Sequence, residues 1–147
     1  LRFTSPHPKD FPPHLLQLIA ERPNICKQIH MPLQSGSDSV LARMRRGYGA
    51  DAYFALVEEA RAKIPGLALS TDVISGFCGE TEEEHQATVD MMRRVKFEQA
   101  YMFAYSERPR THAFHRMADD VPQEVKLRRL QDVIAAFRAG AAERATE

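Results

Sequence analysis

The chain has 147 residues, the size of one ordinary domain, and its 44% hydrophobic and 27% charged residues are a normal balance for a globular core. Its 20 Lys and Arg residues balance 20 Asp and Glu residues, so there is no global positive field, and any RNA contact must come from a local patch. No run approaches the roughly 20 consecutive apolar residues that cross a bilayer, so we expect no membrane contact.

Segments typical of strands and helices alternate along the chain. The expected strands are residues 1–4, 25–31, 67–75 and 99–105, and the expected helices are residues 11–21, 37–46, 51–64, 82–97 and 123–142. Strand and helix repeat at roughly 30–40 residues per unit, which is typical of βαβ units and a parallel sheet. A complete eight-unit barrel takes about 250 residues. The chain is therefore either a small open α/β sheet or part of a barrel.

The two ends and the cysteines give further expectations. The chain begins at Leu1, inside the first expected strand, and shows no initiator Met, signal peptide or transit peptide. We therefore expect it to be part of a longer protein. Cys26 and Cys78 belong to no Cys-x-x-Cys pair, so we expect two reduced structural thiols and no metal site.

The segment 70–81 combines a strand end with a helix start. Its β-prone apolar run stops at Gly76, the chain turns through Gly79, and a helix opens at Thr81. Thr81 and Glu84 have capping-box spacing, in which each side chain binds an N–H group of the first helical turn. Ligands of α/β proteins bind at the C-terminal ends of strands, so this segment is the best candidate for a binding loop.

Polar residues and glycines also follow the other expected strands. The four segments after the strands are residues 5–8, 32–36, 76–80 and 105–108. Parallel strands place these ends on one rim, where they converge on a ligand. Simpler interpretations as turns, special backbone geometry or helix-dipole partners stay open for the run 34–36, for Gly76 and for Glu80. Asp72 in an apolar strand needs a partner and favours a functional role, whereas His30 is typical of a hydrogen-bonded core histidine.

A second patch follows the last expected strand. It interleaves basic residues with an aromatic one: Arg108, Arg110, His112, Phe114, His115 and Arg116. This pattern suits contacts to the phosphates and bases of RNA, which we assign to Arg108, Arg110, His112 and Arg116. A solvated loop balanced by Asp119 and Asp120 is the alternative.

Taken in order, six segments resemble the radical S-adenosylmethionine (SAM) methylthiotransferases. They read RFTSPHP at 2–8, HMPLQSGS at 30–37, MRRGY at 44–48, STDVISGFCGET at 70–81, FAYSER at 103–108 and DDVP at 119–122. Within this family the chain is similar to the enzymes that convert N6-isopentenyladenosine in tRNA to its 2-methylthio form. The resemblance covers nearly the whole chain.

The resemblance implies a fold and cofactors. The fold is α/β, a partial (β/α)6 radical SAM TIM-like barrel, and residues 1–147 match about its last four strands, the C-terminal portion of the core domain. The family also has an N-terminal domain, a Cys-x-x-x-Cys-x-x-Cys loop for the SAM-binding [4Fe–4S] cluster, a second [4Fe–4S] cluster and a C-terminal RNA-binding domain, and this sequence contains none of their motifs. SAM, two clusters and tRNA are thus expected of the full-length protein, and the chain alone is expected to be inactive.

The family's site roles carry over to matched positions. Asp72 would point into the barrel near the reaction centre as a catalytic residue. The SAM-binding positions would be Gln34, Ser35 and Gly36 near the ribose or carboxylate, Ile74 against the adenine, Gly76 and Glu80 in the same motif, and Phe103 and Tyr105 along the adenine.

The sequence departs from the bacterial pattern at two positions, with Cys78 where bacterial members have Pro and Arg110 where they have Gly. Cys78 and residues 111–116 resemble the eukaryotic mitochondrial branch, and the Gly replaced by Arg110 argues against carrying over a tight turn at that position. We expect a mitochondrial protein, with a cytoplasmic location as the alternative.

Other functions stay open. Related methylthiotransferases act on threonylcarbamoyl-adenosine in tRNA or on a ribosomal protein. A truncated isoform without catalysis, acting as an interaction module for a protein partner, would equally lack the cluster cysteines. We expect the protein to be a monomer.

Overall fold

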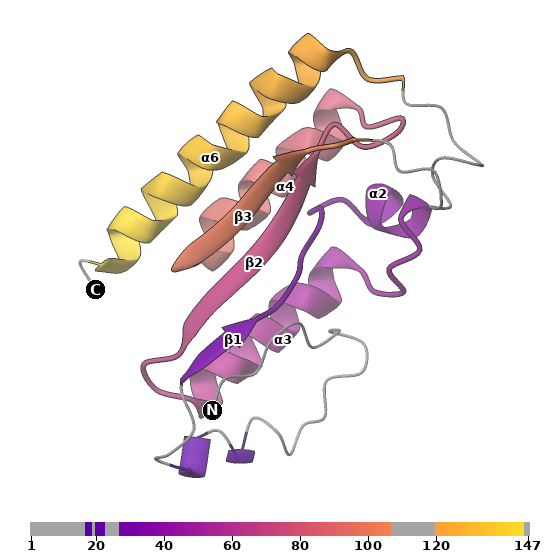
Figure 1. The fold of residues 1–147 in the computed structure, drawn as a ribbon. Coiled ribbons are helices and arrows are strands. Elements are labelled where there is room, and N and C mark those ends of the chain that lie inside the picture. Colours follow the sequence, from indigo (N-terminus) through magenta and orange to yellow (C-terminus); the bar gives the residue numbers. More distant parts are fainter. Residues whose placement is uncertain (1–16, 19, 23–26, 107–119, 146–147) are drawn as a thin grey trace.

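The computed structural model describes residues 17–18, 20–22, 27–106 and 120–145 (Figure 1). Its elements are β1 (Gln28–His30), α2 (Asp38–Arg43), α3 (Ala50–Lys63), β2 (Ala68–Ser75), α4 (Glu82–Val95), β3 (Gln99–Ala104) and α6 (Gln123–Ala145). Residues 17, 18, 20 and 21 are helical, within the expected helix 11–21. The strand expected at residues 1–4 lies outside the described residues.

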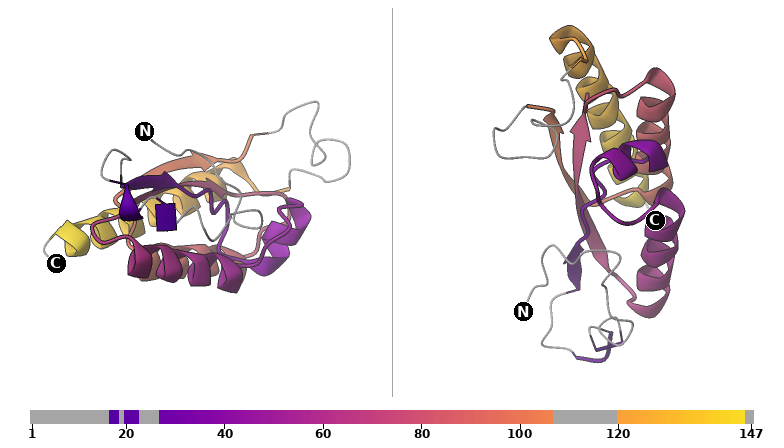
Figure 2. Two further views of the ribbon diagram at one scale, coloured as in Figure 1. Left: turned by 90° about the horizontal axis from the view of Figure 1, so that it is seen from below. Right: turned by 90° about the vertical axis from the view of Figure 1, so that its right-hand side faces the viewer.

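Within the described residues, three parallel strands form one sheet in the order β1–β2–β3. Parallel neighbours need crossover connections, and helices α2 and α3 precede β2 while α4 precedes β3. Figure 2 shows α3, α4 and α6 on the same side of the sheet. Helix α6 packs against α4, β2 and β3. The α/β class and the parallel sheet expected from the sequence are confirmed.

Strand β1 ends at His30, one residue earlier than expected, although the Met31 N–H still donates to the Ser70 carbonyl at 2.9 Å. The next N–H, that of Leu33, donates to the Thr71 hydroxyl at 3.0 Å instead of to a backbone carbonyl. Pairing resumes at Gln34, which bridges to Val73 with one extra residue on the β1 side. Such an extra residue bends a strand as a β-bulge does, and the chain leaves the sheet here toward α2.

Helix α4 begins and ends for local reasons. The Thr81 hydroxyl accepts the Glu84 N–H at 3.2 Å, and the Glu84 carboxylate accepts the Thr81 N–H at 2.8 Å, so the expected capping box is confirmed. The helix ends at Val95, earlier than expected, because Lys96 takes the left-handed conformation with φ 57°. Phe97 then enters the core, where it is fully buried.

Alternate residues of the strands face opposite sides of the sheet. On β2 the buried residues are Leu69, Thr71, Val73 and Ser75, and the partly exposed residues are Ser70, Asp72 and Ile74. On β3 the exposed residues are Gln99, Tyr101 and Phe103. The buried side joins the helices in a core that includes Ile29, Leu69, Val73, Tyr53, Val57, Val89, Met92, Phe97, Val133 and Ala136. We call the helix side the covered face and the opposite side the open face.

Candidate functional site

The open face carries two large aromatic side chains. In the parallel register Asp72 lies beside Tyr101, and Ile74 lies beside Phe103. Tyr101 and Phe103 are 48% and 54% exposed. Partners in register share one face of a parallel sheet, so these four residues form one surface, which we call the aromatic patch. Exposed aromatic rings beside a carboxylate are typical of a binding surface rather than of a core.

His30 connects β1 to the aromatic patch. Its Nδ1 lies 2.8 Å from Ser70 Oγ, and its Nε2 lies 3.1 Å from Asp72 Oδ2. An ionised carboxylate only accepts hydrogen bonds, so Nε2 donates to Asp72 and the Nδ1 of a neutral ring accepts from the Ser70 hydroxyl. His30 is hydrogen-bonded as expected, but its partners lie on the open face and not in the core. We call His30, Ser70 and Asp72 the His30 cluster.

Gln34 is held at the strand end by its backbone. Its N–H donates to the Asp72 carbonyl at 2.8 Å, and its own carbonyl accepts the Ile74 N–H at 3.0 Å. Its φ of 68° lies in the left-handed region, which non-glycine residues rarely adopt. Gln34 is therefore fixed beside the two β2 residues of the aromatic patch, in a strained conformation of the kind found at binding sites.

Ser35 and Gly36 turn from the strand end toward α4. Ser35 is fully buried, and its hydroxyl lies 3.2 Å from the Thr88 hydroxyl, which also accepts the Gly36 N–H at 2.9 Å. A Cβ on Gly36 would lie 2.5 Å from the backbone oxygen of Ala87, so only glycine fits there. The structure thus brings Gln34 to the patch and uses Ser35 and Gly36 to anchor the loop on α4.

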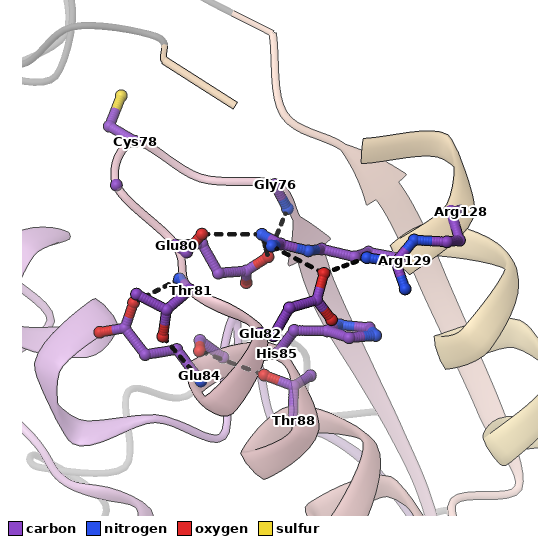
Figure 3. Close-up of polar contacts among 12 residues, drawn as sticks. Gly76, Cys78, Glu80, Thr81, Glu82, Glu84, His85, Thr88, Arg128 and Arg129 are labelled. Carbon is purple, nitrogen blue, oxygen red and sulfur yellow. Dashed lines mark hydrogen bonds and ion pairs between the residues drawn. The ribbon is translucent and has the colours of Figure 1, made fainter. Parts of the chain in front are cut away.

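The turn after β2 is closed by a buried ion pair (Figure 3). The Glu80 carboxylate accepts the Gly76 N–H at 3.0 Å and the Arg129 Nη1 at 3.0 Å, and Arg129 also donates to the Glu80 carbonyl at 2.8 Å. The side chains of Glu80 and Arg129 are only 1% and 6% exposed. Burial raises the pKa of Glu80, against the lowering effect of the Gly76 N–H and the Arg129 guanidinium. Glu80 therefore ties the turn to α6 from inside the protein.

Lys126, on α6, occupies the space above Gly76. A Cβ on Gly76 would lie 2.3 Å from Lys126 Cγ, and Gly76 has φ 79°, so both space and backbone favour glycine. The Lys126 ammonium donates to the Tyr105 carbonyl at 3.2 Å and lies 5.3 Å from the centre of the Tyr105 ring. The Phe77 ring meets that ring edge-on at 5.0 Å. The ends of β2 and β3 are thus joined through α6.

Cys78 lies in a separate network between α2 and α4. Its thiol is buried, as expected of a structural cysteine, and its carbonyl accepts Arg43 Nε at 3.1 Å. Arg43 also makes two hydrogen bonds to the Glu84 carboxylate, at 3.0 and 3.1 Å, and Ser39 donates to the same carboxylate. Burial acts to raise the pKa of Glu84, but the hydrogen bonds from Arg43, Ser39 and the Thr81 N–H prevail and lower it to about 2.

Two classes of site are absent from the part of the chain that the structure describes. No three His, Cys, Asp or Glu side chains gather there in a way that could hold a metal ion. Among the helices of the same residues, none has the length and apolar composition needed to cross a bilayer.

The expected RNA contacts Arg108, Arg110, His112 and Arg116 lie outside the described residues and stay a prediction.

The sequence pattern gave no role to Tyr101, Lys126 or Arg129, and it predicted that His30 is a core residue. Lys126 and Arg129 are three positions apart on one helix, so they share a face, and that spacing is the signal that could have found them. Tyr101 and His30 become neighbours of Asp72 only through the strand register.

Comparisons with known proteins agree with the family resemblance. Residues 1–92 match the family model of the radical SAM superfamily. The chain is 61% identical over 138 residues to a Mus musculus protein named mitochondrial tRNA methylthiotransferase CDK5RAP1, an alignment that covers 94% of this chain and 24% of the mouse protein. It is 59% identical over 137 residues to a CDK5RAP1-like protein of Oryza sativa subsp. japonica, covering 93% of this chain and 23% of that protein.

A bacterial relative is similar over nearly the same region. The chain is 52% identical over 134 residues to a Chlorobium luteolum protein named tRNA-2-methylthio-N(6)-dimethylallyladenosine synthase, covering 91% of this chain and 30% of that protein. The chain therefore spans between 23% and 30% of the length of these curated relatives.

Proposed function

The chain belongs to the radical SAM superfamily, and we propose that it is part of the catalytic barrel of a tRNA methylthiotransferase. The single observation that carries this proposal is the likeness, over most of the chain, to eukaryotic and bacterial proteins that are named for this activity. The parallel sheet with helices on one side is consistent with a partial TIM-like barrel. Residues 1–147 would be the C-terminal portion of the core domain, with the open face toward the barrel interior.

Membership of the superfamily implies SAM and iron–sulfur chemistry. The open face suits SAM, because Phe103 and Ile74 offer an aromatic and an aliphatic surface for adenine, and Asp72 offers a carboxylate for polar groups. SAM held by Phe103, Ile74 and Asp72 would supply radical chemistry for removal of hydrogen from the substrate. The protein's own part is to bind, orient and exclude water.

Some of the remaining SAM-binding positions would not contact SAM but would hold the loops that carry the contacting residues. We assign Gln34 to the ribose or carboxylate of SAM, with Ser35 and Gly36 holding its loop on α4. Gly76 and Glu80 would keep the turn after β2 in place through Arg129, and Tyr105 would continue the adenine surface from Phe103. Because these groups are fixed before a ligand binds, little conformational entropy is lost on binding.

The described residues do not fit an iron–sulfur cluster, since they contain no group of three ligating side chains. We propose that the ligands of two [4Fe–4S] clusters belong to other parts of a longer protein. No step of the reaction is assigned to Cys78, whose buried side chain packs with Val40 of α2 and with Phe77.

The substrate would be N6-dimethylallyladenosine (also called N6-isopentenyladenosine) in tRNA, with Arg108, Arg110, His112 and Arg116 contacting its phosphates. The names of the mammalian relatives support a mitochondrial location. We further propose a monomer that needs no membrane contact.

The test is the nucleoside composition of tRNA in cells that lack the full-length gene. Mass spectrometry should find 2-methylthio-N6-dimethylallyladenosine lost from mitochondrial tRNA and restored by the wild-type gene. Loss of the modified nucleoside from cytoplasmic tRNA instead would indicate that the protein acts in the cytoplasm. Loss of a 2-methylthio group from threonylcarbamoyl-adenosine or from a ribosomal protein would change the substrate. Unchanged RNA and ribosomal proteins would leave a non-catalytic interaction module as the better reading.

A further inference from the structure

The His30 cluster lies on the open face next to the residues that we assign to SAM, and no role has yet been given to its histidine. We propose that His30 is a positioning residue that fixes the Asp72 carboxylate, so that the second carboxylate oxygen binds a hydroxyl or N–H group of an adenosine nucleoside. This inference rests on the proposed function, because that function brings adenosine nucleosides to the open face.

His30 is held from three sides. Ser70 contacts Nδ1 at 2.8 Å, Asp72 contacts Nε2 at 3.1 Å, and the Tyr101 ring packs against the imidazole with 6.0 Å between ring centres and 61° between planes. The His30 side chain is 15% exposed. A ring with both nitrogens engaged and one edge against an aromatic has little freedom to turn. It therefore fixes the orientation of its hydrogen-bond partner.

Asp72 keeps binding capacity after it has accepted the His30 hydrogen bond. A carboxylate has two oxygens and can accept about four hydrogen bonds. His30 uses Oδ2, and Oδ1 has no hydrogen-bond donor among the described residues. The Asp72 side chain is 31% exposed and lies on the open face. The arrangement is that of an oriented acceptor with one position left for a ligand.

The surroundings select the kind of ligand. Tyr101 is in register with Asp72, and the pair Ile74 and Phe103 lies one side-chain repeat further along the strands, about 7 Å away. Aromatic surface next to a carboxylate acceptor suits a nucleoside, whose base stacks while its hydroxyl and amino groups donate hydrogen bonds. An adenosine could come from SAM or from the modified nucleotide of tRNA, and two separate measurements distinguish these sources.

Two amide variants of His30 distinguish a role in positioning Asp72 from a role in packing alone. In His30→Gln the amide nitrogen can take the place of Nε2 and still donate to Asp72. In His30→Asn the shorter amide takes the place of Nδ1 near Ser70 and cannot reach Asp72. Both variants remove the ring, so a role that depends only on packing should be damaged similarly in the two. Gln28→Ala is the matched control, because Gln28 is exposed on the same strand and face.

The experiment uses the full-length protein. Binding of S-adenosylhomocysteine is measured by calorimetry, and the KM for an anticodon stem–loop RNA carrying N6-dimethylallyladenosine is measured with the reconstituted enzyme under anaerobic conditions. We expect Asp72→Asn and His30→Asn to weaken one of these two by about tenfold, in line with loss of a hydrogen bond to a charged group. His30→Gln should stay within about threefold of wild type, and Gln28→Ala should match it.

Coupling between the two residues is the decisive readout. If His30 acts through Asp72, the double variant His30→Asn/Asp72→Asn should bind no more weakly than Asp72→Asn alone. Losses that multiply, equal damage from His30→Gln and His30→Asn, or unchanged binding of both probes would each overturn the positioning role. A wild-type protein that binds S-adenosylhomocysteine but modifies no RNA would instead refute the proposed function, while the calorimetry would still decide the role of His30. A wild type that binds neither probe would refute both.

Discussion

The covered and open faces of the sheet are built from alternate residues of the same strands, yet they serve different ends. On β2, Val73 is fully buried under the helices, while its neighbours Asp72 and Ile74 face the other side. The covered face is apolar and closed by α3, α4 and α6. The open face carries the aromatic patch and the His30 cluster. Among the described residues, one side therefore forms the apolar core, and the other side carries the exposed aromatic and polar side chains that we propose as a binding surface.

The two faces meet at the turn after β2, where residues of α6 hold the ends of β2 and β3 in place. Glu80 and Arg129 form a buried pair behind Gly76, and Lys126 reaches from α6 to the end of β3. Variants on the helix side should therefore lower stability, and variants on the open face should lower ligand affinity.

The largest effect is expected from Arg129→Ala. This change leaves the buried Glu80 carboxylate without its cation, which costs about 3–5 kcal/mol in the free energy of unfolding. The measurement is urea denaturation of the full-length protein followed by circular dichroism. Arg128→Ala is the matched control, because Arg128 is 53% exposed and pairs only with the exposed Glu82 among the described residues. It should cost less than about 0.5 kcal/mol. An equal loss of unfolding free energy in both variants would argue against a stabilising role for the buried Glu80–Arg129 pair.

Met92→Ala tests the covered face itself. Met92 is fully buried in the core, and removal of its side chain should cost about 3 kcal/mol through lost burial and the cavity left behind. Denaturation midpoints in urea report this loss. Ligand affinity measured well below the midpoint should change little, since the side chain does not reach the open face. A large loss of affinity in still-folded protein would show that the two faces are coupled.

Acid should weaken the α2–α4 contact through Glu84. The folded-state pKa of Glu84 is about 2, below its ordinary value of 4.5. A lowered carboxyl pKa contributes stability that is complete above pH 4.5 and is lost as the pH falls toward 2. The contribution is on the order of 2 kcal/mol after allowance for solvent screening of the partly exposed Arg43. Glu84→Gln should flatten the acid side of a stability profile between pH 5 and 2, and a parallel shift of the whole profile would contradict this assignment.

Phe103→Ala should have the smallest effect on stability. The ring is 54% exposed, so its removal should change the free energy of unfolding by less than about 0.5 kcal/mol. Affinity for S-adenosylhomocysteine should fall about tenfold, because stacking of a base on an aromatic ring contributes about 1–3 kcal/mol. Calorimetry measures the affinity, and Leu127→Ala, an exposed apolar residue on α6, is the control. If stability fell strongly instead, Phe103 would be a core residue and not part of a binding surface.

Local features were predictable from the sequence. The capping box joins Thr81 and Glu84, three positions apart, so its contacts form within one helical turn. The alternation of strands and helices predicted the parallel sheet, and Asp72 stood out because a carboxylate is unusual in an apolar strand. The bend after His30 was not predicted, because the shifted pairing at Gln34 depends on which residues of β2 it meets.

The α/β class, the main helices and strands, and the family to which the chain belongs could be predicted from the amino-acid sequence, because they depend on local periodicity and on ordered motifs. The contacts of His30 with Asp72 and of Arg129 with Glu80 become visible only in the three-dimensional structure. Those partners come from different elements, with Arg129 and Glu80 49 positions apart. Their meeting depends on the register of parallel strands and on how α6 lies across the sheet, which no local pattern specifies.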